Sequence, residues 1–266
     1  MSTITDAEFV RFQRFIHEAA GIALTPAKKA MVSGRLSKRL RELQLDSFTA
    51  YLALLDSGGE SGETQFAIDL LTTNETYFFR EPKHFELLGR LAEAAAACGQ
   101  PFRVWSAASS TGEECYSMAM VLADRLGEAN WEVVGSDISA RVLQRARFGH
   151  YPLSRAQHIP AAYKKRFCLK GMGAHEGTLL VDRELRKRVV FSMVNLNADL
   201  PRMVPFDVIF LRNVMIYFNG DTKRQVVARV LSLLKPGGYF CIGHSESLHD
   251  VNASVEQVAP SIYRKQ

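Results

Sequence analysis

Apolar residues in most of this chain occur in short runs that alternate with longer segments of helical spacing. Three of these runs lie between Phe102 and Trp105, from Trp131 to Gly135, and from Phe206 to Leu211. Short apolar runs bounded by turn residues are typical of strands that are buried on both faces of a parallel sheet. The segment from Cys115 to Leu126 has apolar residues at helical spacing. The alternation predicts an α/β domain.

The pattern changes between Cys168 and Met193. Three apolar runs, FCLKG, GTLLVD and KRVVFSM, follow one another too closely for crossover helices to lie between them. We therefore expect an antiparallel β insertion at about 168–193 on the larger sheet. A last strand near Ser254 to Tyr263 is expected to return antiparallel at the sheet edge.

The first 71 residues contain only helical patterns. The stretch from Thr5 to Glu8 has the spacing of a capping box, and Gly21 is placed to end the helix that follows. A second helix is expected to be capped by Thr25, with Pro26 at its first position. Asp46 is expected to cap a third. This part of the chain therefore predicts an all-α domain.

The composition limits the classes of protein to consider. With 266 residues and 47% hydrophobic content, the chain can bury a sizeable core. No apolar run is long enough to span a membrane and the N-terminus MSTITDAEF lacks a signal-peptide pattern, so we expect a cytoplasmic protein without direct membrane insertion. The four scattered cysteines favour reduced thiols over a zinc site. The net charge of +5 fits an acidic partner but is too small to demand nucleic acid.

A loop of small residues predicts a ligand site. The stretch RVWSAASSTGEE, residues 103–114, joins a predicted strand to a predicted helix and lets a ligand approach the backbone. Asp137 ends the next strand and is placed to accept hydrogen bonds from ribose hydroxyls. Because the full G-x-G-x-x-G is missing, an adenosine cofactor without a pyrophosphate, such as S-adenosylmethionine, is favoured. The alternative is a generic α/β domain in which Asp137 caps a helix.

The segment between the two patterns is rich in aromatic residues. Residues 72–81, TTNETYFFRE, combine polar side chains with three aromatic ones and carry Arg80 near their end. Connectors are ordinarily polar and mobile, so this segment is predicted to pack over a site; the alternative is that it only joins two domains. We predict a helical domain over 1–71, a linker contributing to the cofactor site over 72–90, and an α/β domain over 91–266.

The second predicted helix is strongly basic. Lys28, Arg35, Lys38, Arg39 and Arg41 surround its apolar stripe. A solvated face is the plainer interpretation. The sharper one is a docking surface for an acidic helix or for nucleic acid.

Five segments together resemble one protein family. In order they are NETYFFRE, RVWSAASSTGEECYSMAM, SDIS, RNVMIYF and LLKPGGYFCIGHSE. They closely resemble the bacterial chemotaxis receptor methyltransferases of the CheR type. The resemblance implies a Rossmann-like S-adenosylmethionine-dependent methyltransferase domain behind an all-α, receptor-docking domain. It also implies methyl transfer to glutamate side chains of methyl-accepting chemotaxis receptors, with S-adenosylhomocysteine as product and no metal.

The resemblance further implies roles for particular residues. Arg80 and Tyr217 are expected close to the transferred methyl group as catalytic residues. Cys115 departs from the family pattern, because members often have proline at this position. It comes directly after the expected contact residue Glu114, so the departure leaves the predicted pocket residues unchanged. The residues expected to line the cofactor pocket are Asn74, Thr76, Arg80, Ala108, Glu114, Asp137, Asn195, Leu196, Arg212 and Asn213.

The implied chemistry needs little from the enzyme beyond placement. A glutamate carboxylate has an unperturbed pKa of about 4.3, so it is ionised at neutral pH and needs no general base. Arg80 or Tyr217 can hold that carboxylate by donating a hydrogen bond. Glu114 is expected to bind the ammonium group of the cofactor; the alternative is an acid that merely stabilises the first turn of a helix.

The expected partners are receptor signalling helices and a receptor tail. We expect Arg35, Lys38 and Arg39 to dock acidic receptor helices, and the protein to be a monomer that binds no nucleic acid. Some members of the family hold a C-terminal receptor peptide on the β insertion as an added strand. The loop Gly171 to Gly177 resembles theirs, and four basic residues would suit an acidic peptide: Arg183, Arg186, Lys187 and Arg188.

Other functions are compatible with parts of the sequence. A nucleic-acid N-methyltransferase would explain the basic helix, but such enzymes commonly carry an Asn/Asp-Pro-Pro-aromatic box where this chain has Arg212-Asn213-Val214-Met215. A small-molecule methyltransferase would not need the basic helical domain. A non-catalytic module that senses S-adenosylmethionine is the third alternative.

Overall fold

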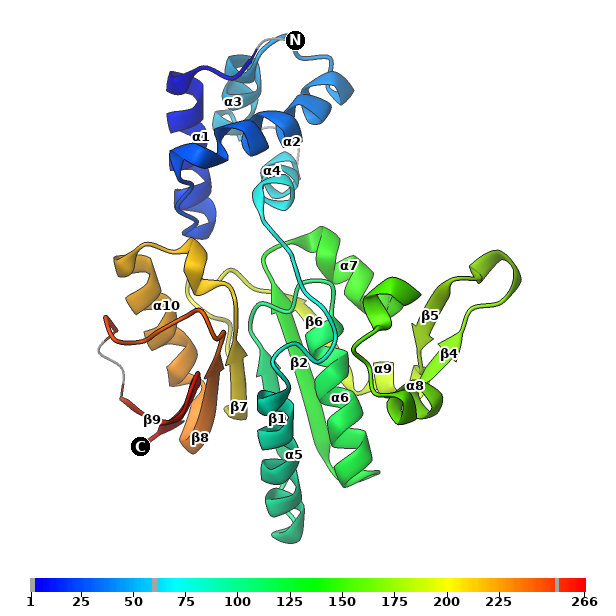
Figure 1. The fold of residues 1–266 in the computed structure, drawn as a ribbon. Coiled ribbons are helices and arrows are strands. Elements are labelled where there is room, and N and C mark those ends of the chain that lie inside the picture. Colours follow the sequence, from blue (N-terminus) through cyan, green and yellow to red (C-terminus); the bar gives the residue numbers. More distant parts are fainter. Residues whose placement is uncertain (1–2, 59–61, 252–253) are drawn as a thin grey trace.

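The N-terminal part of the chain folds into a helical domain that lies above a larger domain built on a sheet (Figure 1). The computed structural model describes residues 3–58, 62–251 and 254–266. The helical domain buries its own apolar core, which includes Phe12, Leu36 and Tyr51. Its elements are α1 (Asp6–Ala20), a 3-10 turn (Pro26–Lys28), α2 (Lys29–Glu42), α3 (Phe48–Asp56) and α4 (Glu63–Leu71).

The capping box at the start of α1 is confirmed. The Thr5 side chain accepts a hydrogen bond from the backbone N–H of Glu8, and the Glu8 carboxylate accepts one from the Thr5 N–H. Gly21 ends the helix with φ of 72°. A Cβ at this glycine would lie 2.7 Å from the Thr222 side chain, so Gly21 also permits close contact between the two domains.

The next two predicted helix starts differ in outcome. Thr25 precedes the helical segment and Pro26 is at its first position, as predicted, but the Thr25 side chain makes no cap hydrogen bond. Helix α3 is capped by Ser47, whose side chain accepts from the Ala50 N–H at 3.1 Å, and not by Asp46. Aspartate and serine both favour the N-cap position. The choice between the neighbours Asp46 and Ser47 depends on which residue has an extended backbone at the helix start.

Within the described residues, the main sheet has seven strands in the order β6-β2-β1-β7-β8-β10-β9. The first five strands of this order run parallel, and β10 is antiparallel to both of its neighbours. The predicted α/β fold is thereby confirmed. The strands are β1 (Phe102–Ser106), β2 (Trp131–Asp137), β6 (Val189–Met193), β7 (Phe206–Leu211), β8 (Leu234–Ile242), β9 (Val255–Ala259) and β10 (Ile262–Lys265).

Successive residues of the central strands pack on opposite faces of this sheet. Val104 and Phe210 join the core beneath α5 and α6, whereas Trp105 and Ile209 join the core beneath α10. Both faces are therefore covered, which explains why these strands are mostly apolar, with a charged residue only near the start of each run: Arg103, Glu132 and Asp207. The covering helices are α5 (Pro82–Ala97), α6 (Glu113–Leu126), α7 (Ala140–Phe148) and α10 (Gly220–Ser232).

The predicted β insertion needs a correction. Its first two strands form as expected, β4 (Cys168–Lys170) and β5 (Thr178–Val181), but the third partner is β3 (His150–Pro152). The run KRVVFSM instead supplies β6, which pairs parallel with β2 in the main sheet. The insertion therefore does not extend to 193. The sequence pattern marks each run as a strand, but its pairing partner depends on contacts far away in the sequence.

Short elements complete the α/β domain. Within the described residues, the last predicted strand is in fact a hairpin of β9 and β10, with β9 at the sheet edge. None of the helices described is both long and apolar enough to cross a membrane. All four cysteines are free thiols. The remaining elements are α8 (Ala161–Phe167), α9 (Arg183–Lys187) and the 3-10 turns Leu153–Ala156, Gly173–His175 and Met215–Tyr217.

Candidate functional site

A pocket lies where the strand order of the sheet reverses, between β1 and β7. In open α/β sheets, the carboxyl ends of the strands at such a switch point form a ligand crevice. The pocket is partly open to solvent, and the empty space in it, including the solvent at its mouth, is about 1060 Å³. The structure brings all the predicted site residues together here: Asn74, Thr76, Arg80, Ala108, Glu114, Asp137, Asn195, Leu196, Arg212, Asn213 and Tyr217.

Asp137 lies at the end of β2 and is almost fully buried. Its carboxylate accepts backbone hydrogen bonds from Ser110 at 2.9 Å and from Ser139 at 3.0 Å. Burial raises the pKa of Asp137, and these two N–H groups oppose that rise. The cap of α7 is Ser139, whose side chain accepts from the Val142 N–H. The alternative that Asp137 itself caps this helix is therefore wrong.

The small-residue loop holds its backbone against this carboxylate. Ser110 adopts a positive φ of 48°, and Gly112 one of 92°. A Cβ at Gly112 would lie 2.9 Å from the Ala146 side chain, so only glycine fits without displacing α7. Ala107, Ala108 and Ser110 all line the pocket. A flat ligand can therefore reach the backbone at the start of α6.

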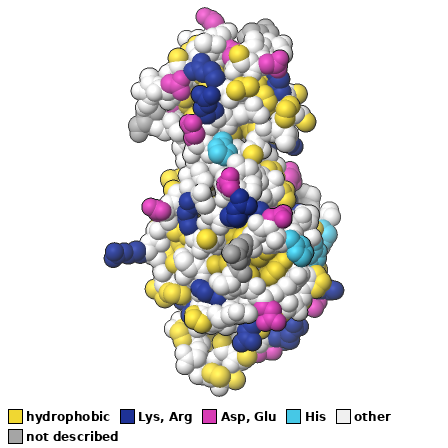
Figure 2. All heavy atoms as spheres, turned by 90° about the vertical axis from the view of Figure 1, so that its left-hand side faces the viewer, with side chains coloured by type: hydrophobic (Ala, Val, Ile, Leu, Met, Phe, Trp, Pro, Cys, Tyr) yellow, Lys and Arg dark blue, Asp and Glu magenta, His cyan; other side chains and the backbone are white. Residues whose placement is uncertain are grey.

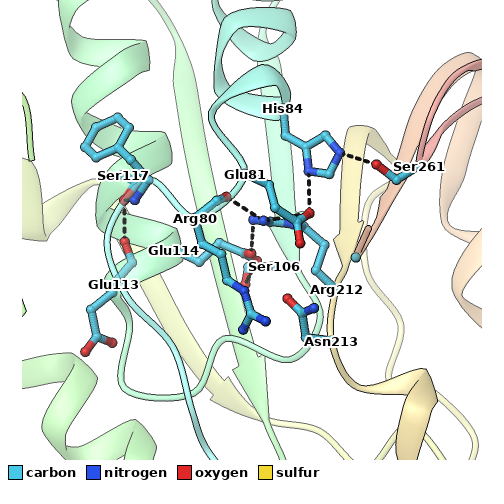
Figure 3. Close-up of polar contacts among 12 residues, drawn as sticks. Arg80, Glu81, His84, Ser106, Glu113, Glu114, Ser117, Arg212, Asn213 and Ser261 are labelled. Carbon is cyan, nitrogen blue, oxygen red and sulfur yellow. Dashed lines mark hydrogen bonds and ion pairs between the residues drawn. The ribbon is translucent and has the colours of Figure 1, made fainter. Parts of the chain in front are cut away.

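Arg212 is the buried centre of a charged network inside the pocket (Figure 3). Its guanidinium donates to the Glu114 carboxylate at 2.7 Å and to the backbone carbonyl of Arg80. It also lies 3.1 Å from the Glu81 carboxylate. Glu114 accepts a second bond, of 2.8 Å, from the Ser106 hydroxyl. The network ties the linker, β1, β7 and α6 together behind the pocket wall.

Among the described residues, one group of potential metal ligands stands close together. It consists of Glu81, His84 and His244, whose ligand atoms all lie within 4.8 Å of one another. Nε2 of His84 lies 2.9 Å from the Ser261 hydroxyl, and Nδ1 lies 3.5 Å from the Glu81 carboxylate. Burial lowers the pKa of His84 to about 3. The Arg212 guanidinium lies 3.1 Å from Glu81 and offsets part of its charge, and the expected absence of a metal stays a prediction.

The aromatic linker is packed against the α/β domain and is not an exposed connector. The Phe79 N–H donates to the Ser117 hydroxyl at 2.9 Å, which fixes the linker on α6. Phe79 and Glu81 both have positive φ, of 55° and 60°. Arg80 donates to the Glu75 carbonyl at 3.3 Å, and its guanidinium lies 5.6 Å from the centre of the Tyr77 ring. This strained course directs Arg80 to the pocket.

Tyr217 supplies a hydroxyl to the same pocket from the 3-10 turn after β7. Burial raises the pKa of Tyr217, and the nearby positive charge of Arg80 opposes the rise. The phenol is therefore protonated at neutral pH and can donate a hydrogen bond. Arg80 and Tyr217 give the pocket a charged and a neutral donor for an anionic group.

The helical domain forms one wall of the pocket, which the sequence analysis missed. The Asn195 amide donates to the backbone carbonyl of Ala19 at 2.7 Å, and Ile22 forms a β-bridge with Phe218. No local signal marks these residues, because in the sequence they look like ordinary core or turn positions. The lining residues from this domain include Ala20, Ile22, Leu24, Lys28 and Met31.

The three residues predicted to dock receptors differ in their surroundings. Arg35 is half-buried and donates to the backbone carbonyls of Leu70 and Thr72. Arg39 is paired with a buried glutamate of α4. Only Lys38 is an exposed cation, with 79% of its side chain accessible. On the face drawn in Figure 2, positive and negative side chains are interspersed, so that face offers no single basic patch.

The lining of the pocket fits one kind of cofactor. Carboxylates can accept from hydroxyl and ammonium groups, and small residues of the loop suit a flat ring. Arg80 and Tyr217 can donate to an anion beside it. These features match an adenosine linked to an amino acid, as in S-adenosylmethionine.

Comparison with family models gives two matches that together cover most of the chain. The model described as "CheR methyltransferase, SAM binding domain" matches residues 74–263. The model described as "CheR methyltransferase, all-alpha domain" matches residues 7–72.

Individual relatives agree with these matches. A chemotaxis protein methyltransferase of Salmonella typhimurium is 46% identical over 93% of this chain and 86% of its own length. Chemotaxis protein methyltransferase 2 of Pseudomonas aeruginosa is 43% identical over 97% of this chain and 93% of its own. Among solved structures, the glycopeptide N-methyltransferase MtfA with S-adenosylmethionine has a TM-score of 0.34 and 20% identity, covering 58% of this chain and 48% of its own; that likeness is too low to support an inference.

Proposed function

This chain belongs to the CheR methyltransferase family, and we propose that it methylates glutamate side chains of methyl-accepting chemotaxis receptors to form methyl esters. It is an S-adenosylmethionine-dependent methyltransferase, as the match over residues 74–263 shows. The names of its relatives support chemotaxis receptors as substrates. The choice of glutamate oxygen as the methyl acceptor is part of the proposal.

The observation that carries the proposal is that Arg80 and Tyr217 line the same pocket as Asp137 and Glu114. Bound S-adenosylmethionine supplies an electrophilic methyl group on a sulfonium. A glutamate carboxylate, with its usual pKa of about 4.3, arrives ionised and needs no base. Arg80 and Tyr217 hold this anion, and the packed linker excludes water from it. The chain thus provides placement, which is the main requirement of the reaction.

The remaining pocket residues are assigned to the cofactor. Asp137 accepts from the ribose hydroxyls, and Glu114 accepts from the ammonium group of the amino-acid end. Glu114 retains this capacity although it already accepts from Ser106 and Arg212, since a carboxylate offers about four acceptor positions. Loss of the methyl group leaves S-adenosylhomocysteine, which keeps the ribose and ammonium groups assigned to Asp137 and Glu114.

Receptor docking is assigned to the exposed cations of α2 and of the 3-10 turn that precedes it. Lys28, Lys38 and Arg41 are exposed, and Lys28 also lines the pocket. Exposed cations suit an acidic receptor helix whose glutamates must reach Arg80. Arg35 and Arg39 contribute to docking only indirectly. They hold α2 in place, because Arg35 donates to the linker and Arg39 pairs with α4.

The small sheet of β3, β5 and β4 is proposed to hold a receptor C-terminal peptide as an additional strand. Strand β4 is at one end of this sheet, with Leu169 56% exposed and Met172 82% exposed beside it. The basic residues expected to attract an acidic peptide are, however, mostly engaged in contacts within the protein. Three of the four basic residues named above have partners elsewhere: Arg186 donates to Val181, Lys187 to Glu184 and Arg188 to Ala129. The exposed cations in or next to β4 are Lys165, Arg166 and Lys170, and of these Arg166 is paired with Asp124 at 2.7 Å.

Two other functions differ from this proposal in their products. A nucleic-acid N-methyltransferase would leave a stable methyl group on a base. A sensing module would bind the cofactor and transfer nothing. The interspersed charges on the face in Figure 2 give the first alternative no added support.

One experiment separates the three functions. The protein is incubated with methyl-labelled S-adenosylmethionine and either receptor-containing membranes or nucleic acid. Alkali-labile label on the receptor is expected, and it should be absent when the receptor glutamates are replaced by alanine. Alkali-stable label on nucleic acid, or no transfer at all, would contradict the proposal.

A further inference from the structure

A single carboxylate after β8 holds the backbone of the segment that carries Asn213 and Tyr217. We propose that Glu246 is a positioning residue for methyl transfer, which acts through this segment without touching substrate or cofactor. This inference rests on the proposed function, because it assigns Asn213 to the cofactor and Tyr217 to the methyl acceptor.

Three backbone N–H groups donate to the Glu246 carboxylate. Oε2 accepts from Asn213 at 2.8 Å and from Gly243 at 2.7 Å, and Oε1 accepts from Met215 at 2.8 Å. Bonds to an ionised acceptor are shorter and stronger than neutral ones. One side chain therefore joins the ends of two neighbouring strands, β7 and β8, on the side of the pocket.

The segment that it holds makes a sharp turn. Asn213 has φ of 57°, in the left-handed region that few residues other than glycine and asparagine enter. A Cβ at Gly243 would lie 2.5 Å from the Asn213 amide nitrogen and 2.9 Å from the Glu246 carboxylate. The corner formed by these three residues is thus tightly packed. Strained backbone of this kind persists only where its surroundings over-determine it.

The backbone held by Glu246 leads directly to two residues of the pocket. Asn213 lines the pocket itself, and Met215 begins the 3-10 turn that ends at Tyr217, which lines it too. Figure 3 shows Asn213 next to Arg212, whose guanidinium holds Glu114. Glu246 accepts from the backbone N–H of Asn213, the residue that directly follows Arg212. Loss of its bonds therefore releases both a cofactor residue and a catalytic one.

The substitution Glu246→Gln tests this role with minimal change of shape. The amide oxygen can replace only one carboxylate oxygen, and the amide N–H₂ group then faces a backbone N–H. The matched control is Asp207→Asn. Asp207 likewise accepts from a backbone N–H, that of Arg103 at 2.8 Å, but it is near the opposite, amino end of β7.

Calorimetry with S-adenosylhomocysteine and receptor methylation kinetics are the readouts. For Glu246→Gln we expect at least fivefold weaker S-adenosylhomocysteine binding and a lower kcat, with an unchanged KM for the receptor. Asp207→Asn should leave the affinity unchanged even where it lowers Tm. Combining Glu246→Gln with Asn213→Ala should weaken binding little beyond Asn213→Ala alone, because both act through one residue.

Three results would overturn the inference. They are undiminished affinity and kcat in a folded Glu246→Gln protein, an equal loss in the Asp207→Asn control, and fully additive effects in the double variant. The calorimetry is independent of the receptor. A wild-type protein that binds S-adenosylhomocysteine but methylates no receptor would therefore contradict the proposed function and leave the positioning role to be decided by the binding data.

Discussion

Arg39 of α2 pairs with the buried carboxylate of Glu63 in α4 at two points, 3.0 Å from Nε and 2.5 Å from Nη2. Glu63 is 7% exposed and also accepts from the Tyr51 hydroxyl at 2.6 Å. The guanidinium further lies 4.0 Å from the centre of the Phe66 ring. A residue that appeared in the sequence as a free surface cation is thus part of the internal structure of its domain.

The different surroundings of the basic residues predict different effects of charge reversal. Lys38→Glu combined with Arg41→Glu should raise the receptor KM without changing stability, and added salt should do the same to the wild type, because exposed charges are screened beyond about 10 Å at 0.1 M. Arg39→Ala should instead lower the free energy of unfolding by about 3 kcal/mol, because it leaves Glu63 buried and unpaired. Urea denaturation and methylation kinetics separate the two effects. If the methylation kinetics do not respond to salt and the double variant has the receptor KM of the wild type, the docking assignment is contradicted.

Asp137→Ala should weaken S-adenosylhomocysteine binding at least tenfold, because hydrogen bonds to a charged acceptor contribute about 1.5–3 kcal/mol each. Burial raises the pKa of Asp137, so affinity should fall as the pH is lowered, starting above the range in which an ordinary aspartate protonates. Asp221→Ala, on the exposed face of α10, is the control. Isothermal calorimetry over a pH series measures both effects. Unchanged affinity in a folded Asp137→Ala protein would remove this residue from the cofactor site.

Arg80→Ala should lower kcat on the order of 100-fold, the usual cost of removing one fixed donor to a reacting anion. Arg80→Lys should recover only part of the loss, because a point charge does not reproduce the guanidinium geometry. Arg90→Ala, an exposed change on α5, should leave turnover as it is. Initial rates at saturating cofactor are the measurement. Full turnover by Arg80→Ala would mean that the linker only joins the domains.

Receptor peptide binding should depend on the exposed side of β4. A labelled acidic-aromatic peptide from a receptor C-terminus should bind with micromolar affinity and lose binding in Leu169→Asp, whereas Leu153→Asp beside β3 should retain it. Gly173→Pro should also abolish binding, but through the loop itself, since Gly173 has φ of 57° and proline cannot adopt it. Fluorescence anisotropy checks each variant. Absence of wild-type binding at high peptide concentration would leave docking to the helical domain.

Acid should destabilise the protein through His84. Its pKa is lowered to about 3 by burial, from a usual value of 6.5, so between these pH values only the unfolded state binds the proton. The free energy of unfolding should therefore fall as the pH decreases through this window, by up to about 1.4 kcal/mol per pH unit. His84→Gln should flatten this dependence, and His249→Gln, at an exposed position, should not. Urea titrations from pH 7 to pH 4 provide the slopes, and identical slopes in wild type and His84→Gln would contradict the assignment.

Local sequence patterns determined the elements and much of the site. The apolar runs of β1, β2 and β7 mark strands with two buried faces, and the small loop before Glu114 marks a place where a ligand can meet the backbone. Asp137 could be found because strand ends and their acids follow one another at recognisable spacing. These signals are local, since burial, turn geometry and capping act over a few residues.

Only the tertiary structure decided which elements meet. The run that became β6 looked the same in the sequence as β5, but it pairs with β2, which begins 58 positions earlier, while β5 pairs with β3 and β4. The partners of Arg35 and Arg39, the pocket wall from α1 and α2, and the three N–H groups around Glu246 are likewise distant in sequence. Side-chain chemistry limits what a residue can bind, but the folded backbone decides which of several suitable partners comes within reach.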